Sequence, residues 1–445
     1  MLSLKIVSGE KPRQIACSVL ARRAEGAFVE DLLDERLAQA HLSPPDRRLC
    51  QELVYGVVRW QATLDWLMAR KARNQPQNPT LQALLRLGLY QIFWLERIPN
   101  HAAVNETVEL AKHNRLAPQA GFVNALLRNY LREFAPTRAC LAELKLSQPH
   151  LGYSHPEWLV ARWQARWGAA ETARLLAWNN TPPKTFARVN TLKADPAKLL
   201  TQWRDENVEY DFVRRDWFDE NLVFELKAHP ALDQLPSFRQ GLFYVQDPST
   251  LLAVRELDPR PGETIVDFCA APGGKLTYIA QLLGNQGRLL AQDFNPERLK
   301  VVEENCRRLG AVCDFGLRIA DCGMAKDSGS IRNGNAPLCD RVLVDAPCSN
   351  TGVMRRRVDL RWRLRPEEIQ RLRATQLDLL RQAARLVKPA GVLVYSTCSL
   401  EPEENGDVVH EFLSGHPEFK LDRERELRPF ADGVDGAYVA RLMRG

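Results

Sequence analysis

Hydrophobic residues recur at helical spacing along the first third of the chain. Six apolar residues of segment 81–93 fall on one helical face: Leu81, Leu84, Leu85, Leu89, Ile92 and Phe93. Ser43 precedes two prolines and Asp46, which is the spacing of a capping box ahead of another amphipathic run. Segments 102–113 and 121–134 repeat the periodicity. The pattern predicts a bundle of about six helices with its own core over residues 1–145.

The pattern changes after this bundle. Residues 154–157 have the spacing of a second capping box, ahead of two tryptophan-rich helices that end near Trp178. Short β-prone runs follow at 185–189, 209–213, 222–226 and 242–246. We interpret residues 146–240 as a small α+β segment.

From about residue 241 to the end at 445, apolar runs typical of buried strands alternate with amphipathic helices. This alternation predicts a mainly parallel sheet with helices on both faces, which is a Rossmann-like α/β domain. Ligands bind such sheets beyond the carboxyl ends of the strands. We therefore expect the chemistry in loops that directly follow predicted strands.

The composition is that of a soluble globular protein. The chain has 445 residues, 45% of them hydrophobic, and no apolar run approaches the roughly 20 residues of a membrane span. Residues 1–13 lack the apolar core of a secretion signal, so we expect a cytoplasmic protein, monomeric and with no membrane partner. The net charge of +6 mildly favours a polyanionic partner.

The ten cysteines show neither a Cys-x-x-Cys pair nor a cluster with histidine at zinc-finger spacing. We therefore expect no metal, and free thiols in a reducing compartment. Only Cys348 and Cys398 have a sequence context that indicates chemistry.

The loop at residues 265–275 organises the predicted α/β domain. It reads Ile-Val-Asp-Phe-Cys-Ala-Ala-Pro-Gly-Gly-Lys, which indicates a strand, a tight loop and the start of a helix. Paired glycines let the backbone approach a ligand closely, and the helix offers unpaired amides to its polar groups. The spacing matches neither the dinucleotide fingerprint nor a P-loop. The loop nevertheless indicates a nucleotide-type site.

Two cysteine motifs also follow predicted strands. Residues 345–352 read Asp-Ala-Pro-Cys-Ser-Asn-Thr-Gly, and residues 395–400 read Tyr-Ser-Thr-Cys-Ser-Leu. Cys348 and Cys398 should therefore lie on the ligand-binding edge of the sheet. Asp293 comes about 20 residues after the glycines, where a carboxylate can accept ribose hydroxyls; a helix cap is its alternative role.

The order of these three motifs resembles the RNA cytosine-C5 methyltransferases, a class I group with S-adenosylmethionine as cofactor. The resemblance implies that the cofactor is held by Cys269, Ala270, Ala271, Pro272, Gly273, Gly274, Lys275, Asp293, Asp321 and Asp345. It places Asp321 near the adenine, although aspartate also favours turns.

Cytosine C5 is a poor nucleophile, and addition of a thiolate at C6 activates it. The resemblance implies that Cys398 is this nucleophile and that Cys348 assists product release, whereas DNA-type enzymes use the Pro-Cys cysteine for addition. Lys275 could lower the pKa of the Cys398 thiol. Asp345 would hydrogen-bond the N3/N4 edge and distinguish cytosine from uracil. The alternatives are a buried thiol for Cys398 and a strand-end cap for Asp345.

Further resemblances concern RNA. Segments 46–59, 99–106 and 121–128 resemble the NusB family of RNA-binding helical domains. Its basic side chains either contact phosphate or line solvated helix faces. Residues 188–193 resemble part of an RNA-recognition segment, which makes Arg188 and Lys193 candidate backbone contacts.

The densest basic patch follows the Pro-Cys motif and includes Trp362. Its RNA-binding candidates are Arg355, Arg356, Arg357, Arg361 and Arg363. Because a thiol must reach C6, we expect the target in an unpaired or locally opened RNA segment.

The whole domain order, all-α NusB-like bundle, α+β segment and Rossmann-like methyltransferase domain, is similar to the bacterial Sun/Fmu (RsmB) family, which methylates a cytosine of 16S ribosomal RNA. A tRNA or 23S rRNA cytosine methyltransferase would carry the same motifs. A non-catalytic RNA-binding assembly factor is the alternative from another class, although Cys348, Cys398, Asp345 and Lys275 are all present.

Overall fold

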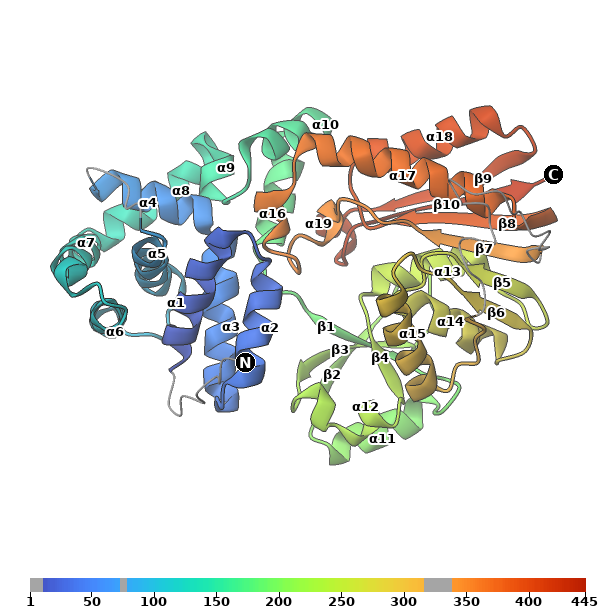
Figure 1. Cartoon of the computed structure of the whole chain (residues 1–445), viewed down its shortest axis with the longest axis horizontal. Helices are drawn as coiled ribbons and strands as arrows, with labels where there is room; N and C mark the ends of the chain where they lie inside the picture. Colours follow the sequence, from blue (N-terminus) through green and yellow to red (C-terminus); the bar gives the residue numbers. More distant parts are fainter. Residues whose placement is uncertain (1–10, 73–77, 316–337) are drawn as a thin grey trace, which may run out of the picture. The chain divides into compact units, whose positions relative to one another are not determined.

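A computed structural model describes residues 11–72, 78–315 and 338–445 (Figure 1). The chain forms two compact units. The helical unit contains Met1–Thr181 and Met354–Arg363, and the α/β unit contains Pro182–Val353 and Leu364–Gly445. Sequence reasoning divided the chain at residues 145 and 240, whereas the observed contacts keep the helices up to residue 179 with those before them.

The helical unit confirms the predicted bundle. Its helices are α1 (Pro12–Arg22), η1 (Arg23–Glu25), α2 (Val29–Gln39), α3 (Pro44–Arg59), α4 (Gln61–Lys71), α5 (Pro79–Trp94), α6 (Asn100–His113), η2 (Ala117–Gln119), α7 (Ala120–Arg132), α8 (Phe134–Ser147), α9 (Pro149–Gly152), α10 (Glu157–Asn179) and α16 (Leu360–Arg363). Ser43 caps α3 as expected, because its hydroxyl accepts the Asp46 amide at 3.3 Å. Apolar side chains of α1 to α7 share one core.

The second predicted capping box is wrong. Ser154 has a φ of +57° and lies before α10, whose N-cap is Pro156. Its hydroxyl instead accepts the amide of Ala62, in the first turn of α4, at 3.0 Å. The side chain therefore caps a helix about ninety positions away in the chain, a pairing that spacing alone does not reveal.

A segment from late in the chain, Met354–Arg363, completes the helical unit. Asp359 is fully buried there and pairs with Arg23 at 2.6 Å and with Arg363 at 2.9 Å. The same carboxylate accepts the amide of Val29, the first residue of α2, at 3.0 Å. This interaction also places a negative charge at the N-terminus of α2, where the helix dipole favours it.

Arg361, in the same segment, is completely buried. Its guanidinium donates to the carbonyl oxygens of Arg59 at 3.3 Å, Ser154 at 3.2 Å and Asn179 at 2.9 Å. It also donates to the side-chain oxygen of Asn180 at 2.8 Å. Burial lowers the pKa of Arg361, and the nearby charge of Arg59 lowers it further. One guanidinium thus hydrogen-bonds backbone carbonyl oxygens at the ends of several helices.

The α/β unit contains a small antiparallel sheet of four strands in the order β2-β3-β1-β4. Its elements are β1 (Thr185–Val189), α11 (Pro196–Asp205), β2 (Glu209–Val213), β3 (Val223–Ala228), η3 (Leu232–Gln234), α12 (Pro236–Arg239) and β4 (Phe243–Val245). The predicted strands are confirmed to within two residues at each end. The apolar face of this sheet shares a core with the larger domain that follows.

The larger sheet has six strands in the order β6-β5-β7-β8-β10-β9. Neighbours from β6 to β8 run parallel, and β10 pairs antiparallel with β8 and β9. Its elements are η4 (Pro248–Thr250), α13 (Leu251–Leu257), β5 (Thr264–Asp267), α14 (Gly274–Leu283), β6 (Arg288–Ala291), α15 (Pro296–Leu309), β7 (Cys339–Asp345), η6 (Thr351–Val353), α17 (Pro366–Ala384), β8 (Val387–Thr397), η7 (Pro402–Glu404), α18 (Gly406–Gly415), β9 (Phe419–Leu427), α19 (Pro429–Asp432) and β10 (Ala437–Arg444).

Helices cover both faces of this sheet, as predicted. Figure 1 shows α17 and α18 on one side and α13 to α15 on the other. Alternate residues of one strand enter different cores: Ile265 packs with α13 and α14, while Val266 packs with α17 and α18. A Rossmann-like mixed sheet results, with the strands of the predicted motifs at its centre.

Asp267, the last residue of β5, is a buried carboxylate. Burial, followed by the charge of Asp345, raises its pKa from 3.8 to about 7. The positive charge of Lys275 opposes this shift only in part. Asp267, at the carboxyl end of β5, is therefore protonated under mildly acidic conditions.

Replacing Arg361 with alanine should lower the free energy of unfolding by about 3 kcal/mol, because several buried carbonyl oxygens lose their donor. Chemical denaturation of the full-length protein measures this change. Arg357→Ala, an exposed arginine of the same segment, should change stability by less than about 0.5 kcal/mol. Equal stabilities for the two variants would contradict the structural role of Arg361.

The raised pKa of Asp267 predicts a pH dependence of stability. Between pH 3.8 and about 7 the folded chain retains a proton that the unfolded chain has released. The contribution of Asp267 to the free energy of unfolding therefore falls as pH rises through this window and is constant above it. Urea denaturation at a series of pH values should show a flatter dependence for Asp267→Asn than for the wild type. Parallel curves would refute the assignment.

Candidate active site

The loop between β5 and α14 depends on its two glycines. Gly273 is the N-cap of α14 with a φ of +103°, a conformation that other residues adopt only with strain. A Cβ atom on Gly274 would lie 3.0 Å from the ring of Tyr244. The helix then begins at once, and its first-turn amides face the loop without partners inside the helix. The predicted ligand-binding loop thus has the expected geometry.

The buried side chain of Arg188 hydrogen-bonds the start of α14, directly after this loop. It is 1% exposed, and its guanidinium donates to the carbonyl of Gly274 at 2.9 Å and to the hydroxyl of Thr277 at 3.1 Å. The cation also lies 4.9 Å from the ring centre of Tyr278. Burial lowers the pKa of Arg188 to about 10. The expectation of an RNA contact is corrected here, because the interior position leaves no guanidinium face for a phosphate.

Asp293 lies beside the same loop. Its carboxylate accepts the amide of Ala271 at 3.2 Å and the amide of Asn295 at 3.0 Å, and it lies 3.4 Å from Arg298. The cap of the next helix is Asn295, whose side chain accepts the amide of Glu297 at 2.9 Å. The helix-cap alternative therefore belongs to Asn295, and Asp293 orients the loop. The other predicted carboxylate, Asp321, lies outside the described residues.

Lys275 and Asp345 form a close ion pair. The Lys275 Nζ atom lies 2.5 Å from Asp345 Oδ2, and the hydroxyl of Ser396 donates to Asp345 Oδ1 at 2.8 Å. Burial alone would lower the pKa of Lys275, but the charge and hydrogen bond of Asp345 outweigh it and the pKa is raised. Lys275 is therefore a permanent cation at the ends of β5, β7 and β8.

Cys348 and Cys398 lie close together. Their motifs predicted that both would lie at the same edge of the sheet. Their Sγ atoms are 3.3 Å apart. Asn350 joins the two loops, because its side-chain oxygen accepts from Cys398 at 3.1 Å and its amide donates to the carbonyl of Cys348 at 2.7 Å. Sequence reasoning missed this role of Asn350, although its left-handed φ of +58° is typical of asparagine in a tight loop.

The two thiols have different surroundings. Cys348 is buried, and its contact with Cys398, followed by its burial, raises its pKa well above the ordinary value. Cys398 is more exposed, and its charge is among the interactions that raise the pKa of Lys275. The lysine is therefore within electrostatic reach of Cys398, which the sequence alone left open. This arrangement favours a neutral thiol at Cys348 and leaves Cys398 as the more accessible of the two thiols.

Two glycines, Gly352 and Gly436, lie where the cysteine loops approach the start of β10. A Cβ atom on Gly352 would lie 2.7 Å from the carbonyl oxygen of Cys398 and 2.8 Å from Gly436. The Gly352 amide donates to that carbonyl at 2.9 Å, and the Gly436 amide donates to Gly352 at the same distance. The crossing explains why glycine ends the Asp-Ala-Pro-Cys-Ser-Asn-Thr-Gly motif.

The other RNA-binding candidates are mostly engaged within the protein. Lys193 donates to the carbonyl oxygens of Gln240 at 3.0 Å and Arg308 at 2.7 Å, and so caps the end of α15. The side chain is exposed, which keeps a further contact to RNA phosphate open.

The arginine-rich segment is corrected more strongly. Arg355 and Arg361 are buried, and Arg363 donates to backbone carbonyls and to Asp359 inside the helical unit. At these three positions the arginine side chains therefore form contacts inside the protein. Arg356 is half-buried and Arg357 is exposed, so Arg357 is the member that faces solvent most fully.

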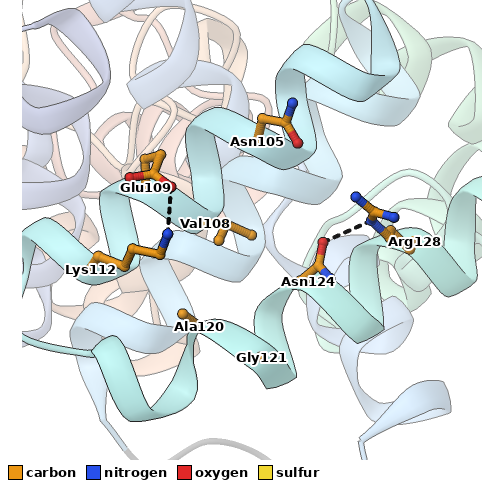
Figure 2. A pocket seen from close by; sticks show the side chains of 8 residues that line it. All are labelled: Asn105, Val108, Glu109, Lys112, Ala120, Gly121, Asn124 and Arg128. Carbon is orange, nitrogen blue, oxygen red and sulfur yellow. Dashed lines mark hydrogen bonds and ion pairs between the residues drawn. The ribbon is translucent and has the colours of Figure 1, made fainter.

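A groove of 340 Å³ lies between α6 and α7 of the helical unit (Figure 2). Lys112 donates to Glu109 at 2.7 Å there, and Arg128 donates to Asn124 at 2.9 Å. Both basic residues therefore have a partner within the groove. Both interactions are exposed to solvent, so the groove offers no preformed binding site for an anion.

Within the described ranges, no group of three or more His, Cys, Asp or Glu side chains is arranged to hold a metal ion. The same part of the chain has no helix that is both long and apolar enough to cross a membrane.

Three family models match successive parts of the chain. The model described as "16S rRNA methyltransferase RsmB/F" matches residues 254–442. The NusB family model matches residues 10–132, and a ferredoxin-like domain model of RsmF/B-like methyltransferases matches residues 155–224. The domain order predicted from the motifs is the same.

Curated relatives and solved structures match over most of the chain. "Probable ribosomal RNA small subunit methyltransferase B" of Bacillus subtilis is 37% identical over 97% of this chain and 98% of its own length. "Ribosomal RNA small subunit methyltransferase B" of Yersinia pseudotuberculosis is 36% identical over the same shares.

The crystal structure of PH0851 superimposes with a TM-score of 0.76 at 26% identity, covering 98% of this chain and 99% of that one. A methyltransferase homologue from Pyrococcus horikoshii covers 66% of this chain and 97% of its own with a TM-score of 0.55 and 28% identity. Identities of 36% and 37% over nearly complete chains show that this protein belongs to the ribosomal RNA small subunit methyltransferase B family of methyltransferases.

Proposed function

We propose that the chain transfers the methyl group of S-adenosylmethionine to C5 of a cytosine in 16S ribosomal RNA, with Cys398 as the nucleophile. The observation that carries this proposal is the pair of thiols 3.3 Å apart beside the Lys275–Asp345 ion pair. The names of the curated relatives support the small ribosomal subunit as the source of the RNA.

The loop residues fit a cationic nucleoside cofactor. Gly273 gives the loop its left-handed turn at the start of α14, and Asp293 and Asp267 add carboxyl groups beside the loop. S-adenosylmethionine carries a positive sulfonium and supplies an electrophilic methyl group when bound. The proposed holding residues are the loop 269–275 with Asp293 and Asp345, and the two carboxylates favour that positive charge.

Cys398 and Asp345 would activate the cytosine. Addition of the Cys398 thiolate to C6 forms a carbon–sulfur bond and makes C5 nucleophilic. Asp345 would hydrogen-bond the N3/N4 edge and favour protonation at N3, which neutralises the charge that addition at C6 places on the ring, and the hydrogen bond from Ser396 holds one carboxylate oxygen in place. Lys275 pairs with Asp345 and places a positive charge within electrostatic reach of Cys398.

Cys348 would act after methyl transfer. The C5 proton is then lost to a base, and the C6–sulfur bond breaks to regenerate the Cys398 thiolate. Cys348 lies within 3.3 Å of the departing sulfur, and its neutral thiol can donate a hydrogen bond to the thiolate. This geometry supports the assignment of Cys348 to product release.

The RNA must present the cytosine outside a helical stack, because the thiol needs access to C6. Arg357 and Lys193 are the proposed phosphate contacts among the sequence candidates, since both side chains are exposed. Each contact would strengthen binding without specifying the base.

Removing the two thiols should give different results. Cys398→Ala should abolish methyl transfer to deproteinised 16S rRNA, whereas Cys348→Ala should accumulate a denaturant-resistant protein–RNA adduct. Radiolabelled methyl transfer and denaturing gels measure both. Cys313→Ala is the matched control, because Cys313 and Cys306 form a second close thiol pair at 3.6 Å in the same unit. It should retain full transfer.

Other outcomes decide between the alternatives. Label on bulk tRNA but not on 16S rRNA would keep the chemistry and overturn the substrate. Cofactor binding without label on any RNA would favour a non-catalytic assembly factor.

Asp345→Asn should lower the rate of methyl transfer by about 100-fold or more, because the cytosine loses the carboxylate that favours protonation at N3 during addition. Single-turnover kinetics with saturating RNA measure the change. Asp340→Asn is the control: Asp340 lies on the same strand and pairs with Lys388 at 2.7 Å, away from the cysteines. A rate for Asp345→Asn within tenfold of the control would exclude the proposed role.

A further inference from the structure

A buried carboxylate lies behind the two cysteine loops. Glu404, at the end of η7, has no exposed surface. Its Oε1 atom accepts the backbone amide of Ser349 at 2.8 Å and the side-chain amide of Gln376 at 3.0 Å. Its Oε2 atom accepts the hydroxyl of Ser399 at 2.5 Å and also the hydroxyl of Ser349. The proposed chemistry above gives this residue no task.

The two serines are the residues that follow the two cysteines. Ser349 directly follows Cys348, and Ser399 directly follows Cys398. The serine hydroxyls also lie 3.1 Å from each other. One carboxylate therefore connects the Pro-Cys loop to the Thr-Cys loop.

We propose that Glu404 is a positioning residue that anchors both cysteine loops and so fixes the separation of the Cys348 and Cys398 thiols. Its catalytic consequence rests on the proposed function, whereas its effect on the thiols does not. The side chain would not touch the cytosine or the cofactor.

Packing around Glu404 indicates that the anchor is rigid. Gln376, from α17, donates to both Glu404 and the carbonyl of Pro347, which precedes Cys348. The Tyr395 hydroxyl donates to the Glu404 carbonyl at 2.6 Å. Asn405, the next residue, binds Thr397 at 2.5 Å and so holds the Thr-Cys loop from a second point. A carboxylate held in this way resists displacement of either loop.

The choice of a charged residue also has an electrostatic effect. Every donor to this carboxylate in the described part of the chain is a neutral amide or hydroxyl. Burial raises the pKa of Glu404, and its hydrogen bonds oppose the shift. After the contact with Cys398 and burial, the Glu404 charge is a further cause of the raised pKa of Cys348. Glutamate here thus favours the neutral thiol at Cys348.

The separation of the thiols can be measured without RNA. In glutathione redox buffers, the fraction of full-length protein with a Cys348–Cys398 disulfide reports the effective concentration of one thiol at the other. Peptide mass spectrometry after alkylation quantifies this fraction. Glu404→Ala should lower the effective concentration by about tenfold or more and kcat by about 100-fold, with KM for S-adenosylmethionine little changed.

Two further variants separate position from charge. Glu404→Gln can keep the hydrogen bonds, so the disulfide equilibrium should stay near that of the wild type while the pH midpoint of Cys348 alkylation falls. Tyr395→Phe removes a buried hydrogen bond to the Glu404 backbone and leaves the carboxylate contacts intact, so it should change both measurements much less than Glu404→Ala.

An unchanged disulfide equilibrium in Glu404→Ala would overturn the proposal, even if the wild type methylated RNA normally. Conversely, a wild type that methylates no RNA would refute the proposed function, while the thiol measurement would still decide the role of Glu404. If Glu404→Ala does not fold, Ser399→Ala removes the hydroxyl that joins the Thr-Cys loop to the carboxylate, and Ser349→Ala removes one of the two contacts from Ser349 while its backbone amide still donates. Wild-type equilibria in both serine variants would equally overturn the proposal.

Discussion

The parallel register of β5, β7 and β8 is the constraint on which the site depends. Asp267 pairs in register with Leu343, and Asp345 pairs with Ser396. Because the three strands end at one edge, the glycine loop and both cysteine loops leave the sheet beside each other. A slip of one residue would turn Asp345 to the opposite face of the sheet and remove it from Lys275.

This edge concentrates charge that packing alone would not select. Replacing a buried ion pair such as Lys275–Asp345 by apolar residues is often neutral or stabilising, because desolvation offsets the attraction. Asp267, with its raised pKa, adds a second destabilising group within the same few residues. Such groups concentrate at sites where pKa values are adjusted for catalysis. These groups therefore lower the free energy of unfolding of the α/β unit at the edge where its loops meet.

The sequence predicted features that depend on near neighbours. Hydrophobic period identified the helices and strands, and the motif order placed Cys348 and Cys398 on one edge. It did not predict contacts between distant segments. The residues next to Arg361 in the sequence do not reveal whether its side chain faces RNA or hydrogen-bonds the ends of buried helices. The spacing around Ser154 predicts a cap for α10, whereas its hydroxyl caps α4. Glu404 was missed for the same reason, since burial of a glutamate leaves no local signal.

The late segment Met354–Arg363 has a consequence for biosynthesis. Residues up to Thr181 leave the ribosome roughly ten seconds or more before this segment is made. During that interval Arg23 lacks Asp359, and the carbonyl of Asn179 lacks its guanidinium donor. The helical unit therefore gains these buried contacts only after most of the α/β unit has been translated, so a truncated chain that ends at Thr181 lacks them.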